Sequence, residues 1–363
     1  MPSGTMRAVV FKEPHRVEVE QRPIPQIEDP KDVIVKVEYT ALCGSELHVF
    51  RGHQPSPVGF IMGHEFTGTV EEAGADVMAF KKGDRIVSPF TTACGECFYC
   101  TNGFSSRCES VKLFGSAVLE GAQAQYVRVP SAPSTLFPSP PSAAIPAHLQ
   151  VLLSDIFPTG YFGARTAFSF LPAPSIRDST CVLLGCGPVG LCALVCALDY
   201  APRRVVAVDG VQARLDRARE LGATETLSLD VGRGKEGRDE VVRKVKEWTA
   251  GRGADVVIEV VGLSDALRLG FEVLRPWGGI SSIGVHNGEI PWTGNEAYGK
   301  NLRIHMGRCP VRSIFPEALE QLKKKQHLLG FMADKIMPLT QAVEGYELFD
   351  KMKVQKVIFE AQK

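Results

Sequence analysis

The chain has 363 residues, and its 41 lysines and arginines balance its 41 aspartates and glutamates. Hydrophobic residues make up 44% and charged residues 23%, an ordinary globular composition with enough length for two hydrophobic cores. A nucleic-acid-binding protein is excluded, because the densest basic run, 323–325, is too short to bind a phosphate backbone.

The start of the chain has no apolar signal-peptide core, and no stretch offers the roughly 18 apolar residues of a membrane span. We therefore expect a cytoplasmic protein that binds neither membrane nor nucleic acid. In a reducing compartment, ten cysteines in one chain hold metal more often than they form disulfides, so their spacing matters more than their number.

Residues 7–130 contain short β segments, such as 33–37 and 85–87, separated by Gly, Pro and Asp turns. Six prolines in 130–146 predict a surface connection. Beyond it, strand patterns alternate with helix patterns at 181–184, 191–199, 205–208, 213–221 and 256–260. This alternation predicts a parallel sheet. The chain then ends with a predicted helix near 317–325 and a predicted strand at 354–359.

Two short segments near residues 43 and 64 carry zinc donors. Cys43 is followed by Ser45 and His48, and His64 is followed by Glu65. Thiolate, imidazole and carboxylate groups are the usual protein ligands of zinc, although each segment alone is weak evidence.

Four cysteines at Cys94, Cys97, Cys100 and Cys108 could close a tetrahedral shell around one zinc ion. Such a shell leaves no open coordination position for a substrate, so the zinc site would be structural. An iron–sulfur cluster and free thiols are the alternatives, but the ferredoxin pattern has a shorter last gap and a proline after the final cysteine, where this chain has Glu109. The remaining thiols outside both segments are predicted to be small core residues: Cys181, Cys186, Cys192, Cys196 and Cys309.

The segment Gly185-Cys186-Gly187-Pro188-Val189-Gly190 follows a predicted strand and opens a predicted helix. In that context the G-x-G-x-x-G spacing predicts a dinucleotide site, with Gly185 at the turn, Gly187 facing the pyrophosphate and Gly190 packing helix on strand. Pro188 and Val189 would then begin the phosphate-binding helix. A plain strand-to-helix turn is the alternative.

Asp209 ends the next predicted strand, nineteen residues after Gly190. A carboxylate there accepts hydrogen bonds from the adenosine ribose hydroxyls and repels a 2′-phosphate, which favours NAD. Arg214 lies close by in the sequence and could instead accept NADP, support the ribose or face solvent.

With Gly68, Gly74 and Val77, residues 63–77 reproduce the pattern G-H-E-x2-G-x5-G-x2-V, and the chain resembles the medium-chain zinc-dependent alcohol dehydrogenases over nearly its whole length. The resemblance implies Cys43, His64 and a third residue near 155 as catalytic zinc ligands. It also implies that Glu65 can approach the metal when water or product leaves.

The third ligand position reads L-S-D-I-x-P-T-G-Y, with Asp155 in place of the second cysteine of a Cys2His catalytic zinc site. This string is similar to the formaldehyde-dehydrogenase-like branch of the family, in which the aspartate binds zinc. A thiolate and a carboxylate still neutralise Zn²⁺, and the oxygen donor favours a more Lewis acidic metal. A helix N-cap is the alternative role for Asp155.

The resemblance implies hydride transfer from an alcohol, made acidic by zinc, to NAD, with the proton leaving through Ser45 and the cofactor ribose to His48. His48 could instead be a solvent-facing loop residue. Serine at 45, where many relatives have threonine, leaves room for branched or bulky substrates, while Phe90 matches a pocket aromatic of the family.

The predicted fold is α/β. A GroES-like β-rich catalytic domain spans 1–157 and 300–363, a Rossmann domain with a doubly wound parallel sheet spans 158–299, and the active site is expected in the cleft. We expect a homodimer or homotetramer with two zinc ions per chain and a small alcohol, aldehyde or ketone substrate. The alternatives are a zinc-containing NADP-dependent reductase, a zinc-free reductase of the same superfamily, and a non-catalytic NAD-binding zinc protein. Retention of Ser45 and His48, which metal binding does not require, favours an enzyme.

Overall fold

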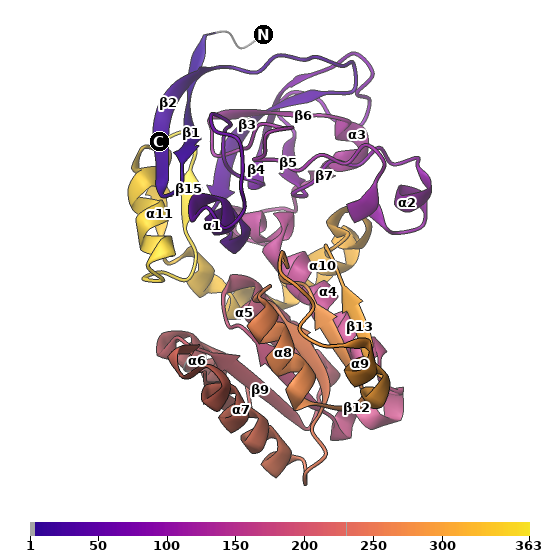
Figure 1. Cartoon of the computed structure of the whole chain (residues 1–363). Coiled ribbons are helices and arrows are strands. Elements are labelled where there is room, and N and C mark those ends of the chain that lie inside the picture. The colour runs from indigo at the N-terminus through magenta and orange to yellow at the C-terminus, as the bar shows by residue number, and fades with distance from the viewer. Residues whose placement is uncertain (1–3, 230) are drawn as a thin grey trace. The chain divides into compact units, whose positions relative to one another are not determined.

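The computed structural model describes residues 4–229 and 231–363 and divides into two compact units (Figure 1). The catalytic unit comprises the chain up to Pro158 together with Pro310–Lys363, and the nucleotide unit comprises Thr159–Cys309. The second boundary falls ten residues later than the predicted 299/300, because strand β13 (Arg303–Met306) pairs with the sheet of the nucleotide unit.

The catalytic unit is built on a seven-stranded sheet in the order β14-β15-β3-β4-β5-β7, with β6 paired to β3. Its strands are β3 (Val33–Ala41), β4 (Glu65–Ala73), β5 (Arg85–Ser88), β6 (Tyr126–Val129), β7 (Phe137–Pro138), β14 (Ile336–Pro338) and β15 (Ile358–Glu360), and β1 (Thr5–Glu13) and β2 (Arg16–Pro23) form a separate hairpin. The proline-rich connection 130–146 contributes the four-residue helix α3 (Ala132–Thr135) and the two-residue edge strand β7. Val35, Val37 and Phe66 are buried in the core between β3, β4 and β6.

The C-terminal segment completes this unit, and Figure 1 shows its yellow elements beside the indigo N-terminal strands. Strand β15 pairs with β3, and α11 packs on β2. The helices of the catalytic unit are α1 (Gly44–Phe50), α2 (Phe98–Thr101), α3 (Ala132–Thr135), α10 (Val311–Lys325) and α11 (Ala342–Asp350). Sequence patterns predicted α10 but missed the nine-residue α11, whose apolar face is interrupted by Gly345.

The nucleotide unit contains six parallel strands in the order β10-β9-β8-β11-β12-β13. Besides β13, they are β8 (Thr180–Leu184), β9 (Arg204–Asp209), β10 (Glu225–Ser228), β11 (Ala254–Glu259) and β12 (Leu274–Ser282). Counted within the unit, this is the order 3-2-1-4-5-6 of a Rossmann fold, which confirms the predicted fold class. The order reverses between β8 and β11, so the loop after β8 lies at the switch point.

Strands β8 and β11 are both buried along their full length, as expected where helices cover both faces of a parallel sheet. The helices are α4 (Ile156–Ser169), α5 (Pro188–Ala197), α6 (Gln212–Glu220), α7 (Gly234–Trp248), α8 (Ser264–Val273) and α9 (Gly294–Lys300). Within residues 4–229 and 231–363, none of the helices is both long and apolar enough to cross a membrane.

Candidate active site and metal centres

Three segments bring the predicted catalytic ligands to one end of the β3–β4 pair. Cys43 follows β3 and precedes α1, and His64 precedes β4, whose Glu65 pairs with Ala41 of β3. The third segment is fastened to β4 by Ser154, whose buried hydroxyl accepts from the Phe66 backbone N–H at 3.1 Å and donates to its carbonyl at 3.0 Å. The next residue, Asp155, therefore reaches the same place.

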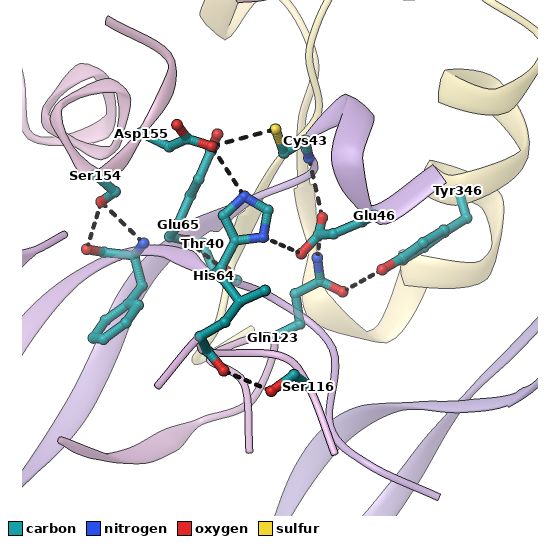
Figure 2. Close-up of polar contacts among 12 residues, drawn as sticks. Thr40, Cys43, Glu46, His64, Glu65, Ser116, Gln123, Ser154, Asp155 and Tyr346 are labelled. Carbon is teal, nitrogen blue, oxygen red and sulfur yellow. Dashed lines mark hydrogen bonds and ion pairs between the residues drawn. The ribbon is translucent and has the colours of Figure 1, made fainter. Parts of the chain in front are cut away.

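The four donor groups face one another in the buried interior of the catalytic unit (Figure 2). Asp155 Oδ2 lies 3.2 Å from His64 Nε2 and 3.6 Å from Cys43 Sγ. Together with Glu65, one ligand atom from each lies within 4.8 Å of all the others. This spacing and the set of sulfur, nitrogen and oxygen donors suit a zinc ion.

Glu46 orients His64 from behind the donor cluster. Its Oε1 lies 3.3 Å from His64 Nδ1, and its Oε2 accepts from the Cys43 backbone N–H at 3.0 Å. Burial alone would lower the pKa of His64, but the Glu46 carboxylate, with Asp155 and Cys43, raises it well above the ordinary value. A histidine ligand with its second nitrogen on a carboxylate is a common zinc arrangement. Sequence reasoning missed Glu46, although its position three residues into α1 from Cys43 is a capping-box signal.

Glu65 is paired with Lys356, and the side chains of both residues are completely buried. Burial raises the pKa of Glu65 to about 7, although the Lys356 ammonium opposes this rise. Burial would lower the pKa of Lys356, but Glu65 outweighs it and raises that pKa. Lys356 holds one carboxylate oxygen, whereas Oε1 has no hydrogen-bond partner among the described residues. Sequence reasoning missed Lys356, which no local pattern distinguishes.

Ser45 and His48 lie three residues apart on α1, and therefore on one face of the helix. Both are partly buried. The described part of the chain shows no hydrogen bond from either residue to the four donors. Burial lowers the pKa of His48, and His53 and Arg51 lower it further. Phe90 packs edge-on against His64, with ring centroids 6.0 Å apart, so its ring borders the donor cluster.

A second centre is formed by the four cysteines of the segment 94–108, which we call the lobe. The sulfur of each lies within 4.8 Å of the other three. Cys94 Sγ lies 4.0 Å from Cys100 Sγ, close to the roughly 3.8 Å expected between sulfurs bound tetrahedrally to one zinc ion. Backbone N–H groups at Glu109 and Cys100 lower the pKa of Cys97 to about 6, which favours the thiolate. The geometry fits one ion in a closed sulfur shell. The other five cysteines outside the two centres are buried, as predicted.

The glycine-rich loop follows β8 at the switch point of the nucleotide unit. A Cβ on Gly190 would lie 2.0 Å from the Gly185 carbonyl oxygen, so the fold itself requires glycine there. Gly187 differs, because its backbone is extended and a Cβ would meet no described atom within 4 Å. The open space beside Gly187 fits close approach of a ligand. Pro188 and Val189 form the first turn of α5.

Asp209 ends β9 beside this loop. Its carboxylate accepts from the Cys186 backbone N–H at 2.7 Å and from the Val211 backbone N–H at 2.8 Å. Arg214 lies 3.9 Å from the same carboxylate, so its charge is directed at Asp209. The acidic group therefore lies where the glycine-rich loop meets the second strand of the Rossmann unit.

A Rossmann unit with this loop, joined in one chain to a β-rich unit holding a buried metal-donor cluster and a four-cysteine centre, defines a metal-dependent dehydrogenase. Family models agree with this assignment. The alcohol dehydrogenase GroES-like domain matches residues 29–141, and the zinc-binding dehydrogenase family matches 188–324.

Relatives and solved structures match almost the whole chain. It is 62% identical over 356 residues to zinc-type alcohol dehydrogenase B of Aspergillus flavus, covering 98% of this chain and 81% of the relative. It is 30% identical to formaldehyde dismutase of Pseudomonas putida, covering 98% and 97%. Alcohol dehydrogenase TADH from Thermus sp. ATN1 superposes with a TM-score of 0.86 at 32% identity, covering 98% and 99%.

The chain belongs to the medium-chain zinc-dependent alcohol dehydrogenase family. It is a zinc-dependent oxidoreductase that acts on alcohols. These comparisons confirm the resemblance predicted from residues 63–77.

Proposed function

We propose that Cys43, His64 and Asp155 hold the catalytic zinc and that the four lobe cysteines hold a second, structural zinc. The mutual approach of four buried donor atoms to within 4.8 Å carries this proposal. Cys43 as thiolate and Asp155 as carboxylate supply two negative charges against Zn²⁺. Glu65 is the reserve ligand, because Lys356 holds one oxygen while Oε1 keeps its lone pairs available.

Zinc, when bound, supplies the Lewis acidity that lowers the pKa of an alcohol hydroxyl. The protein excludes water from this site, since Cys43, His64 and Glu65 are at most 5% exposed. Phe90 supplies an apolar wall next to His64. Such surroundings strengthen the electrostatic effect of a cation on the substrate oxygen.

The proton leaves by a route along α1 in this proposal. Ser45 would accept the proton of the substrate hydroxyl and donate its own hydroxyl proton toward the ribose of a bound cofactor, and His48 would deliver a proton to solvent. The lowered pKa of His48 supports this role, because a neutral imidazole is needed to accept a proton. The small Ser45 side chain supports branched or bulky alcohols as substrates.

We infer that the cofactor is NAD. A nicotinamide bound there would supply the hydride acceptor. The open space beside Gly187 supports pyrophosphate binding, and the carboxylate of Asp209 next to the loop supports recognition of an unphosphorylated ribose. Arg214 pairs with that carboxylate, which leaves it less available to a 2′-phosphate.

We further propose a homo-oligomer in a reducing compartment such as the cytoplasm. The outer edge of β13 supports association with a second copy, because Ile304 and Met306 are each 38% exposed on an edge strand. All ten cysteines are free of disulfides, which suits a reducing compartment.

The decisive experiment follows absorbance at 340 nm while the zinc-loaded protein is offered a panel of alcohols with NAD or NADP, and of aldehydes with the reduced cofactors. We expect turnover with an alcohol and NAD. Cys43→Ala should abolish it, whereas Cys181→Ala, which removes an equally buried thiol from β8, should not. Failure of every substrate with both cofactors would favour the non-catalytic zinc protein, and turnover with NADP alone would favour the reductase.

A further inference from the structure

A buried chain of two hydrogen bonds and one ion pair extends from helix α11 to the donor cluster. Tyr346 Oη donates to Gln123 Oε1 at 2.8 Å, and Gln123 Nε2 donates to Glu46 Oε2 at 3.2 Å. Glu46 in turn faces His64 Nδ1 at 3.3 Å. Figure 2 shows the four side chains in this order, from α11 to the cluster. The C-terminal segment is thus linked to the metal site through polar groups.

Burial favours a single arrangement of these polar side chains. Gln123 and Tyr346 are fully buried and Glu46 is 5% exposed, so the polar atoms have little access to water as substitute partners. Burial also raises the pKa of Tyr346 well above its ordinary value, so the hydroxyl remains a donor. A buried carboxylate with too few donors is strongly destabilised, which gives each of these contacts weight.

The direction of each hydrogen bond follows from Tyr346. Its hydroxyl donates to the amide oxygen of Gln123, which turns the amide N–H groups toward Glu46. A flipped amide would set an oxygen against the carboxylate. Glu46 then accepts from Gln123 and from the Cys43 backbone N–H on one oxygen, and faces His64 Nδ1 with the other. With zinc bound, His64 would keep its proton on Nδ1, facing Glu46, and turn the Nε2 lone pair toward the Asp155 and Cys43 donors.

We propose that Gln123 and Tyr346 are positioning residues for the catalytic zinc, acting through Glu46 on the tautomer and orientation of His64. This inference rests on the proposed zinc ligands Cys43, His64 and Asp155. The C-terminal segment thereby contributes to the metal site, because its Tyr346 binds Gln123, which lies 223 residues earlier in the chain. Groups that orient a metal ligand without touching the metal commonly change metal affinity by about 10- to 100-fold.

The test measures zinc release from the holoenzyme to the chelating indicator 4-(2-pyridylazo)resorcinol, with the labile zinc assigned to the catalytic site. Tyr346→Phe removes only the hydroxyl and keeps the ring that packs on Phe50, with centroids 5.2 Å apart. We expect it to weaken retention of the labile zinc by about tenfold. Gln123→Met, of similar length, should do at least as much. Tyr126→Phe, in β6 and outside the network, should match the wild type.

The double variant Tyr346→Phe/Gln123→Met separates a network from independent packing effects. The effects of substitutions within one polar network should not add, so the double variant should release zinc as fast as Gln123→Met alone. A melting temperature lowered in Tyr346→Phe and Gln123→Met without any change in zinc release would show a structural role only and overturn the proposal. A wild type with no labile zinc, or one whose labile zinc survives Cys43→Ala, would instead overturn the proposed ligand set and this inference with it.

Discussion

Asp155 Oδ2 lies 3.2 Å from His64 Nε2, although 91 residues separate the two in the chain. The contact exists because the Ser154 hydroxyl is hydrogen-bonded to both backbone groups of Phe66, which brings the segment before α4 against β4. Asp155 also immediately precedes α4, the position of a helix N-cap. Its carboxylate nevertheless faces a thiol and an imidazole, which favours a metal ligand.

Cofactor preference depends on Asp209. We expect Asp209→Ala to lower kcat/KM with NAD more than with NADP, changing their ratio by about tenfold or more, since hydrogen bonds to a charged group are worth about 1.5–3 kcal/mol. Asp216→Ala, which removes an exposed carboxylate from α6, is the matched control and should leave the ratio unchanged. A wild type that prefers NADP would contradict the role of Asp209 and direct attention to Arg214.

The buried ion pair between Lys356 and Glu65 should stabilise the catalytic unit strongly against loss of either partner. Lys356→Met keeps the length of the side chain but leaves the Glu65 carboxylate without its counter-charge, so we expect a loss of about 3–5 kcal/mol in the free energy of unfolding. The double variant Lys356→Met/Glu65→Gln should recover much of this lost stability. Urea denaturation of both variants measures the effect, and equal stabilities of the single and double variants would argue against the pair.

Proton transfer through His48 gives a pH-dependent prediction. His48 must be neutral to accept a proton, so alcohol oxidation falls as pH drops through its pKa, which burial, His53 and Arg51 lower. His53→Gln removes a side chain that lowers the pKa of His48, so this pKa should rise and the acid limb of the kcat profile should move to higher pH. His327→Gln, at an exposed position on the C-terminal segment, should leave the profile unchanged.

An acid limb that stays in place in His53→Gln, or that moves to lower pH, would remove His48 from the proton route. Rate measurements at each pH should use saturating alcohol and NAD, so that the profile reports kcat alone.

Local patterns predicted three of the six strands of the Rossmann sheet, because β8, β9 and β11 each contain a short continuous apolar run, whereas β10 and β12 do not. The predicted 181–184, 205–208 and 256–260 overlap β8, β9 and β11. Strand β13 was missed because it is an edge strand with exposed residues, and this omission shifted the domain boundary. Helix α11 was missed because it is only nine residues long and a glycine, Gly345, lies on its buried face.

The residues of the candidate site likewise fall into those that the sequence indicated and those that it did not. Cys43 and His64 lie in a spaced motif, and Asp155 lies in a recognisable string, so sequence alone suggested all three. Gln123 and Lys356 contact their acidic partners across 77 and 291 residues respectively. No local spacing marks such residues, because their function depends on contacts that only folding creates.

The lobe should behave as a separate structural centre. Cys97→Ser removes one of four thiolates, so we expect loss of about one zinc per chain and a lower melting temperature, because such lobes fold around their metal. Cys196→Ala, which removes a buried thiol from α5, should keep both zincs. If Cys97→Ser retained two zincs, the closed sulfur shell would be wrong.

Zinc content and kcat of Asp155→Ala, measured on one preparation, test the central claim most directly. If Asp155 is a ligand, the variant should retain about one zinc, remain folded and lose at least about a hundredfold in kcat, because the metal no longer polarises the substrate. Asp155→Cys should recover zinc and part of the activity, since a thiolate restores a common zinc shell. Two zincs in Asp155→Ala, with near-normal turnover and stability lower by about 1 kcal/mol, would identify a helix cap and contradict the proposed site.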